Sequence, residues 1–328
     1  MTSPTRETAV VEDPTRTVRI GTRASTLART QSTLVAEALT AATGLTTELV
    51  LIRTEGDVSP EPLAQIGGTG VFVSALREAL LRGEVDLAVH SLKDLPTAPP
   101  DGIVLAAVPQ REDPRDVVVA RDGLTLGELP AGARVGTGAP RRVAQIEALG
   151  LGVELVGVRG NVDTRIGKVT SGELDAVVLA RAGLARLGRV EEATEVLDPL
   201  QVLPAPGQGA LAVECRADAV LAEVVRTALD HPASRACVEA ERALLVDLEA
   251  GCSAPVGALA EVAEGDLGDE LWMRAVALSY DGALFVRRSA SGPLDDPVGL
   301  GQKLAAEMLS EGAAELINAH TEAARRRL

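Results

Sequence analysis

The feature that most constrains the fold is a pair of local patterns, each of which occurs twice and in the same order. The first is a short apolar strand that runs into a Gly-Thr loop and a helix, at residues 18–31 (VRIGTRASTLARTQ) and 133–146 (ARVGTGAPRRVAQI). The second is a helix ended by glycine and followed by an apolar strand, at 75–91 and 166–183. Strands that alternate with helices are typical of sheets covered on both faces. We therefore expect two similar α/β lobes, each built on a doubly wound sheet.

The rest of the chain predicts a different kind of domain. A helix at about residues 233–249 is followed by strands that include an Asp281-Gly282 hairpin signal, which indicates a small antiparallel sheet backed by helices. The segment LPAPGQGALAVECR adds a strand that we expect to cross back to the first lobe. The expected parts are a flexible tail at 1–17, a first lobe at 18–110 plus about 208–228, a second lobe at 115–204 and an α+β C-terminal domain at 232–328.

Composition excludes several classes of function. The net charge of -15 and the aromatic content of 1% disfavour nucleic-acid binding, because phosphate backbones are repelled and stacking surfaces are scarce. Three cysteines without a CxxC pair and three separate histidines predict no metal site. The polar N-terminus lacks a signal-peptide core, and no apolar run is long enough for a membrane span. We expect a cytoplasmic protein with no membrane partner, and a monomer because no apolar seam stands out.

The stretch GEVDLAVHSLKDLPT, residues 83–97, places polar side chains where an apolar strand ends. In doubly wound sheets the ligand crevice lies at the carboxyl ends of the strands. His90, Ser91, Lys93 and Asp94 are therefore expected at the rim of a crevice, and Pro96 stops the strand. The alternative is that Lys93 and Asp94 are ordinary loop charges.

Each Gly-Thr loop leads into a helix N-terminus, which attracts anions. Arginine side chains bind carboxylates with two parallel hydrogen bonds, so two such loops facing one cleft predict a ligand with several carboxylates. Arg23 accompanies the first loop, and Arg141 and Arg142 the second. The segment VRGNVDTR adds Arg159 and Arg165, and LARLG adds Arg186. For any single arginine, a solvated helix face is the alternative.

Among the three cysteines, Cys252 stands apart because a Gly- and Pro-bounded loop, EAGCSAPVG, presents it. Cys215 lies in an apolar strand and Cys237 in a helix, which fits small buried hydrophobic residues. The loop position indicates that Cys252 is either a nucleophile or a point of covalent attachment.

Taken together, the motifs resemble the porphobilinogen deaminase (hydroxymethylbilane synthase) family. They are IGTRAS, VFVSALREALL, DLAVHSLKDLPT, REDPRD, VGTGAPRR, VRGNVDTR, ARAGLARLG, LPAPGQGALAVECR and ERALL followed by GCSAPVG, in that order. The resemblance covers about residues 18–320. It implies two lobes like those of periplasmic binding proteins and a small C-terminal domain with a three-stranded antiparallel sheet.

The resemblance also implies an activity. Four porphobilinogen molecules are joined head to tail with loss of ammonia, and hydrolysis then releases hydroxymethylbilane, in tetrapyrrole and haem biosynthesis. A dipyrromethane cofactor is held by a thioether to the family's loop cysteine, which corresponds to Cys252. Asp94 would be the catalytic carboxylate. Residues implied in binding the cofactor and substrate are Arg23, Ser25, Phe72, Ser91, Lys93, Thr137, Arg141, Arg142, Arg159, Arg165, Arg186 and Gln208.

Two departures from the family pattern stand out. Gln65 and Thr69 replace lysines common in the family's LAKVGGKG segment, and Gly138 and Ala139 replace the serines of VGTSSLRR. The second change removes hydroxyl groups that would contact the cofactor. A catalytically degenerate relative is therefore one alternative function. A bilobal binding module for a small polycarboxylate is another, favoured by the two-lobed fold alone.

Overall fold

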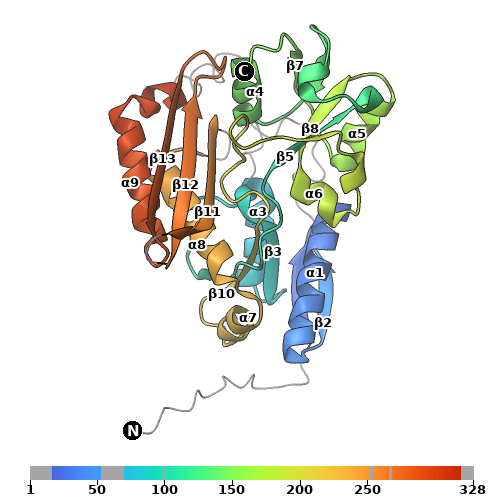
Figure 1. Ribbon diagram of the computed structural model, residues 1–328. Helices are drawn as coiled ribbons and strands as arrows, with labels where there is room; N and C mark the ends of the chain where they lie inside the picture. Colours follow the sequence, from blue (N-terminus) through green and yellow to red (C-terminus); the bar gives the residue numbers. More distant parts are fainter. Residues whose placement is uncertain (1–16, 53–69, 99, 252–253, 266–267, 319–328) are drawn as a thin grey trace. The chain divides into compact units, whose positions relative to one another are not determined.

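The computed structural model describes residues 17–52, 70–98, 100–251, 254–265 and 268–318 (Figure 1). Their contacts divide the chain into two compact units. The first unit comprises Met1–His90, Pro99–Gln110 and Leu211–His231, and the second comprises Ser91–Ala98, Arg111–Ala210 and Pro232–Leu328.

The first unit is built on a five-stranded sheet with the order β2-β1-β3-β10-β4. Its strands are β1 (Val18–Thr22), β2 (Thr47–Leu51), β3 (Leu87–Ser91), β4 (Ile103–Ala107) and β10 (Leu211–Arg216). β1 runs parallel to β2 and β3, whereas β10 and β4 are antiparallel. Strand β3 forms the end of the pattern at 75–91, where an apolar strand is expected after the helix.

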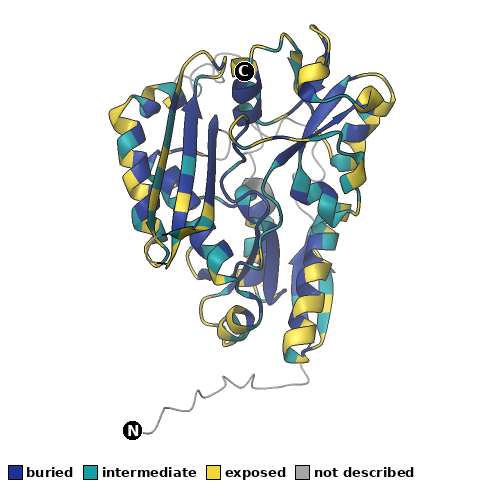
Figure 2. Ribbon diagram, in the orientation of Figure 1, coloured by how far each residue is buried: buried dark blue, intermediate teal, exposed yellow. Residues whose placement is uncertain are grey.

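Helices cover both faces of this sheet. Helices α1 (Thr26–Thr43) and α7 (Leu221–Leu229) pack on one face against Ile20 and Val89, while α3 (Gly70–Leu81) packs on the other against Ala88. Alternate residues of β3 thus serve opposite cores, which explains why nearly every position in this strand is apolar. One side of α1 is buried and the other exposed (Figure 2).

The second unit contains a sheet of the same kind, with the order β7-β6-β8-β5-β9. The strands are β5 (Asp116–Ala120), β6 (Arg134–Gly136), β7 (Glu154–Val156), β8 (Ala176–Ala180) and β9 (Glu195–Val196). Helix α4 (Pro140–Ala148) covers one face, and α5 (Val162–Thr170) and α6 (Arg181–Arg186) cover the other. The predicted repetition is confirmed, because the parallel trio β7-β6-β8 matches β2-β1-β3.

Both sheets are mixed rather than wholly parallel. In the first sheet β10 is antiparallel to β4, and in the second β5 is antiparallel to β8 and β9. The reversed direction of β5 could not be read from its residues, because a buried strand is apolar whichever way it runs. The remaining 3-10 turns are η1 (Leu92–Asp94), η2 (Arg121–Gly123), η3 (Leu126–Glu128) and η4 (Val190–Glu192).

The predicted C-terminal antiparallel sheet is also confirmed, in the order β11-β12-β13. Strands β11 (Val256–Gly265), β12 (Gly268–Leu278) and β13 (Phe285–Pro293) lie side by side, with α9 (Pro297–Ser310) next to them (Figure 1). Helix α8 (Pro232–Asp247) and α9 bury Leu244 and Leu304 against the apolar face of the sheet. The hairpin signal is correct, with Gly282 at φ 69° between β12 and β13.

Candidate active site

The polar segment after β3 is held by the second unit. The backbone N–H of Leu92 donates to the Ala210 carbonyl at 3.0 Å, and the Leu92 side chain is fully buried. Lys93 and Asp94 complete the short turn η1 and are half-buried. The apolar strand therefore ends where the chain passes from one unit to the other, and its first polar residues join the second unit.

The Gly-Thr loop of the second unit directs two arginines inward. After β6, the buried Thr137 accepts a hydrogen bond through Oγ1 from the Ala139 backbone N–H at 3.3 Å. Pro140 then starts α4, a position that suits its fixed φ angle. The first turn of this helix carries Arg141 and Arg142, each only 4% exposed.

Asp116, the first residue of β5, lies at the centre of these cations. Its carboxylate accepts hydrogen bonds from Arg141 Nη1 at 2.6 Å and from Arg142 Nη2 at 2.7 Å, and the Asp116 side chain is fully buried. Burial raises the pKa of Asp116, but the two guanidinium groups outweigh burial and hold the pKa well below its usual range. The carboxylate is thus ionised and balances part of the buried positive charge.

Gln208 connects this ion-paired group to the segment after β3. Its Oε1 accepts from Lys93 Nζ at 3.2 Å and from Arg141 Nη2 at 3.1 Å, while its Nε2 donates to Asp116 Oδ1 at 2.7 Å. The neighbouring Gly207 adopts φ 75°, and a Cβ there would lie 2.4 Å from the Leu92 side chain. Only glycine allows the Gln208 loop to approach Leu92 this closely.

Lys93 has an unusual electrostatic environment. Burial, together with the nearby Arg142 and Arg141, lowers the pKa of Lys93 to about 8, against the opposing effect of Asp94 and Asp116. A cation that is costly to bury is stabilised when a carboxylate ligand arrives. The site therefore favours an anionic ligand.

The other predicted arginines of this unit differ in their surroundings. Arg165, on α5, donates through Nε to the Gly160 carbonyl at 2.9 Å, and burial and Arg142 both lower the pKa of Arg165. Arg186, at the end of α6, donates to the Gly209 carbonyl at 2.6 Å, and burial lowers the pKa of Arg186. Arg159 is exposed in the loop between β7 and α5.

Gly138 is a packing requirement of this chain. A Cβ at position 138 would lie 2.7 Å from the Val158 carbonyl oxygen, so a serine there would displace the loop. Ala139 has room for its own Cβ, and its backbone N–H is already bound to Thr137. The two positions therefore differ: a Cβ at position 138 would clash with the backbone at Val158, whereas position 139 already holds a Cβ.

Some predicted site residues belong to the first unit or are not described. Arg23 and Ser25 follow β1, and the Ser25 hydroxyl caps α1 by accepting from the Ala28 N–H at 3.3 Å. Phe72 is part of α3, but its side chain lies outside the described residues, as do Cys252, Gln65 and Thr69. The residues brought together within the second unit are Lys93, Arg141, Arg142 and Gln208.

Sequence reasoning missed the buried acids, among them Asp116 and Glu214. Glu214, on β10, pairs with Arg77 at 2.7 Å and lies 3.3 Å from Nε2 of His90, which is buried in the first unit. Burial raises the pKa of Glu214, but His90 and Arg77 outweigh burial and lower it to about 2. An acid within an otherwise apolar strand is a sequence signal that marks Glu214, whereas Asp116 directly follows the charged residues REDPR and carries no such signal.

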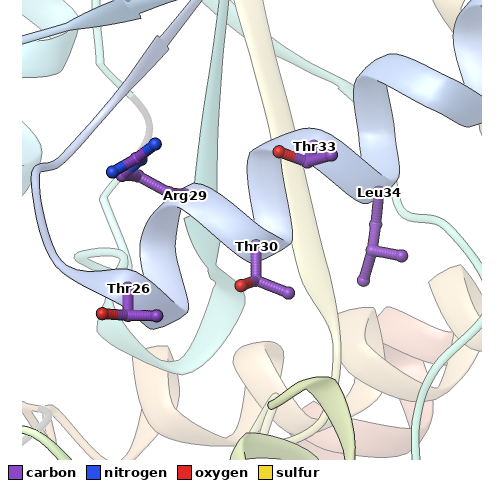
Figure 3. A pocket seen from close by; sticks show the side chains of 5 residues that line it. All are labelled: Thr26, Arg29, Thr30, Thr33 and Leu34. Atoms are coloured by element: carbon purple, nitrogen blue, oxygen red, sulfur yellow. The ribbon is translucent and has the colours of Figure 1, made fainter. Parts of the chain in front are cut away.

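Among the described residues, no group of His, Cys, Asp and Glu has the arrangement of a metal site. None of the described helices is long and apolar enough to cross a membrane. A surface pocket along α1 contains none of the predicted site residues (Figure 3); its lining is Thr26, Arg29, Thr30, Thr33 and Leu34.

Comparisons with solved structures include a periplasmic substrate-binding protein of an ABC transporter from Coxiella burnetii. It is 15% identical, with a TM-score of 0.43, and the match covers 66% of this chain and 94% of that chain.

Comparisons with family descriptions and with curated proteins agree with each other. Residues 18–223 match "Porphobilinogen deaminase, dipyromethane cofactor binding domain", and residues 235–310 match "Porphobilinogen deaminase, C-terminal domain". Porphobilinogen deaminase 1 of Streptomyces coelicolor is 60% identical over 92% of this chain and 98% of its own length. Porphobilinogen deaminase of Nocardia farcinica is 58% identical over 92% of this chain and 88% of its own length. This chain therefore belongs to the porphobilinogen deaminase family.

Proposed function

We propose that this protein is a hydroxymethylbilane synthase. It joins four porphobilinogen molecules head to tail, releases one ammonia at each step, and frees hydroxymethylbilane by hydrolysis. The reaction belongs to tetrapyrrole biosynthesis, including that of haem. The observation that carries this proposal is the pair of family matches, which together cover most of the chain.

The second unit offers a donor set suited to dipyrromethane. Every ring of this cofactor carries an acetate and a propionate, so it needs several cations in one place. Lys93, Arg141 and Arg142 supply them around Gln208. Arg142 Nε is buried and has no hydrogen-bond partner among the described residues, so a ligand carboxylate would satisfy it.

Beyond this central set, we propose that further residues complete the binding of cofactor and substrate. Arg165 and Arg186 are cations whose pKa values burial already lowers, so pairing with a carboxylate would favour their charged form. The other proposed binding residues are Arg23, Ser25, Phe72, Ser91, Thr137 and Arg159.

Asp94 is the proposed catalytic carboxylate. When ammonia leaves the aminomethyl group of porphobilinogen, the C–N bond breaks and a cationic azafulvene remains. Asp94 stabilises this cation, because a fixed carboxylate costs no reorganisation as charge develops. A pyrrole α-carbon then forms the new C–C bond and loses its proton, which Asp94 accepts or passes on. When bound, dipyrromethane supplies the first attacking α-carbon.

The anchoring of the cofactor is tested by intact mass spectrometry. We expect the purified protein to exceed the mass of the bare chain by about two pyrrole units, and the Cys252→Ala variant to lack this surplus. Cys237→Ala is the matched control, because Cys237 is buried on α8 and burial raises its pKa to about 11, which makes it a poor nucleophile. A wild-type mass equal to the bare chain, unchanged after incubation with porphobilinogen, contradicts the proposal.

The same proposal includes a thioether to Cys252, a cytoplasmic location and a monomeric state. It also includes the domain limits expected from the sequence. Size-exclusion chromatography with light scattering tests the monomer. A mass near 33.9 kDa supports it, and a mass near twice that value contradicts it.

A further inference from the structure

The segment that carries Asp94 is bound by helix α8. Arg242, on this helix, donates hydrogen bonds to three consecutive carbonyl groups directly after Asp94. Nη2 lies 2.7 Å from the Pro96 oxygen and 3.2 Å from the Thr97 oxygen, and Nη1 lies 3.4 Å from the Leu95 oxygen. The guanidinium thus follows the backbone over 95–97. Its charge strengthens these bonds relative to bonds between neutral groups.

The residue next to Arg242 binds the other loop of the site. Glu241 is fully buried, and its Oε2 accepts from the Gly207 backbone N–H at 2.5 Å. The same carboxylate pairs with Arg111 at 2.7 Å and accepts from the Ala260 N–H at 2.8 Å. Two adjacent residues of α8 therefore hold the two segments that meet through the hydrogen bond from Lys93 to Gln208.

The turn around Asp94 has its own fixed points on the N-terminal side. Leu92 donates to the Ala210 carbonyl, and the Leu95 N–H closes the turn on the Leu92 carbonyl at 3.1 Å. Leu95 is 4% exposed. On the C-terminal side, the contacts of Arg242 hold the backbone, so Asp94 lies between two anchored segments.

We propose that Arg242 is a positioning residue that fixes the place of Asp94 through the carbonyl groups of residues 95–97. The inference rests on the proposed function, in which Asp94 carries the chemistry. Arg242 itself does not touch the reacting atoms. The planar guanidinium group of Arg242 reaches three carbonyl groups at once, whereas a lysine presents a single ammonium group.

The test compares Arg242→Gln, Arg242→Lys and Arg235→Gln as full-length holoenzymes. Arg235 is the matched control, since it lies on the same helix and pairs with Glu239 within that helix. A displacement of about 1 Å in a catalytic group reduces the rate on the order of 100-fold. We expect Arg242→Gln to lower kcat about 10- to 100-fold with KM within about threefold. Arg242→Lys should recover part of the loss, and Arg235→Gln should match the wild type.

Two further measurements separate positioning from loss of the cofactor or of the fold. Intact mass shows whether each variant keeps the cofactor, and the proposal expects Arg242→Gln to keep it. Hydrogen exchange followed by mass spectrometry reports the backbone at residues 92–98 without any turnover. We expect exchange there to be faster in Arg242→Gln than in Arg235→Gln, with the rest of α8 unchanged.

The outcomes divide clearly. If Arg242→Gln keeps the cofactor and its kcat stays within twofold of Arg235→Gln, the proposal is wrong. It is also wrong if exchange at residues 92–98 is unchanged. Should Arg242→Gln not fold, Arg242→Lys decides, because full activity with unchanged exchange overturns the proposal. An inactive wild type contradicts the proposed function instead, and hydrogen exchange then still tests the contact between Arg242 and this segment.

Discussion

Asp116 holds the cations of the second unit in place because its carboxylate binds both Arg141 and Arg142. Without that charge the two guanidinium groups face each other in a buried site, where unpaired charges are costly. We expect Asp116→Asn to reduce the free energy of unfolding by about 3–5 kcal/mol at pH 7, as for other broken buried ion pairs. Urea unfolding measures this difference. Glu84→Gln is the control, because Glu84 and Arg82 form an exposed pair whose loss should leave the unfolding curve unchanged.

The pH dependence of this difference follows from the lowered pKa of Asp116. The folded-state pKa lies below the unfolded one, so the stabilisation is complete above the unfolded pKa of about 3.9 and is lost as the pH falls through the folded pKa. The wild type and Asp116→Asn should therefore differ most near neutral pH, and the difference should shrink below about pH 4. A difference that stays constant down to pH 2 would mean that Asp116 does not act through its charge.

At the scale of the element, the loop between β6 and α4 allows a direct comparison of two neighbouring positions. A side chain at Gly138 would meet the Val158 carbonyl at 2.7 Å, whereas Ala139 already accommodates a Cβ. We expect Gly138→Ser to lower the free energy of unfolding by about 1–3 kcal/mol, in the range of overpacked sites. Ala139→Ser should be nearly neutral. Thermal unfolding of both variants checks this, and a Gly138→Ser variant as stable as Ala139→Ser would refute the packing argument.

The secondary structure could be predicted largely from local patterns, but strand direction could not. The Gly-Thr loops predicted β1 with α1 and β6 with α4, because each strand and helix leaves a short-range signature. The reversal of β5 against β8 has no such signature, since a buried strand shows the same apolar run in either direction. The elements themselves are therefore more predictable than their arrangement.

The same limit applies to the candidate site. Lys93 and Asp94 could be named as candidates because they follow an apolar strand directly. Asp116 and Arg242 could not, because their partners are distant in the sequence: Asp116 binds arginines 25 and 26 residues away, and Arg242 binds carbonyl groups more than 140 residues away. Long-range contacts of this kind depend on the tertiary fold and leave no local pattern.

At the scale of the whole molecule, we propose that the division into two units serves elongation. Among the places where the chain passes between the units are Gln110–Arg111, beside the REDPRD motif, and Ala210–Leu211; the others are His90–Ser91, Ala98–Pro99 and His231–Pro232. We propose the crossings at Gln110–Arg111 and Ala210–Leu211 as hinges. Under the proposed function, a product chain that grows to as many as six rings shifts past Asp94 after each addition, and hinged units permit such stepwise movement.

Restricting one crossing tests this mechanism. Proline fixes φ near -65°, so Gln110→Pro should stiffen the crossing, and Gln110→Ala controls for loss of the side chain. After limited addition of porphobilinogen, intact mass should show that Gln110→Pro retains the cofactor and accumulates species with one or two added rings. Gln110→Ala should show the wild-type distribution and release product. The early additions proceed because they need little displacement, while later additions need the full movement. If Gln110→Pro turns over fully, with the same distribution of intermediates as Gln110→Ala, translocation does not depend on this crossing.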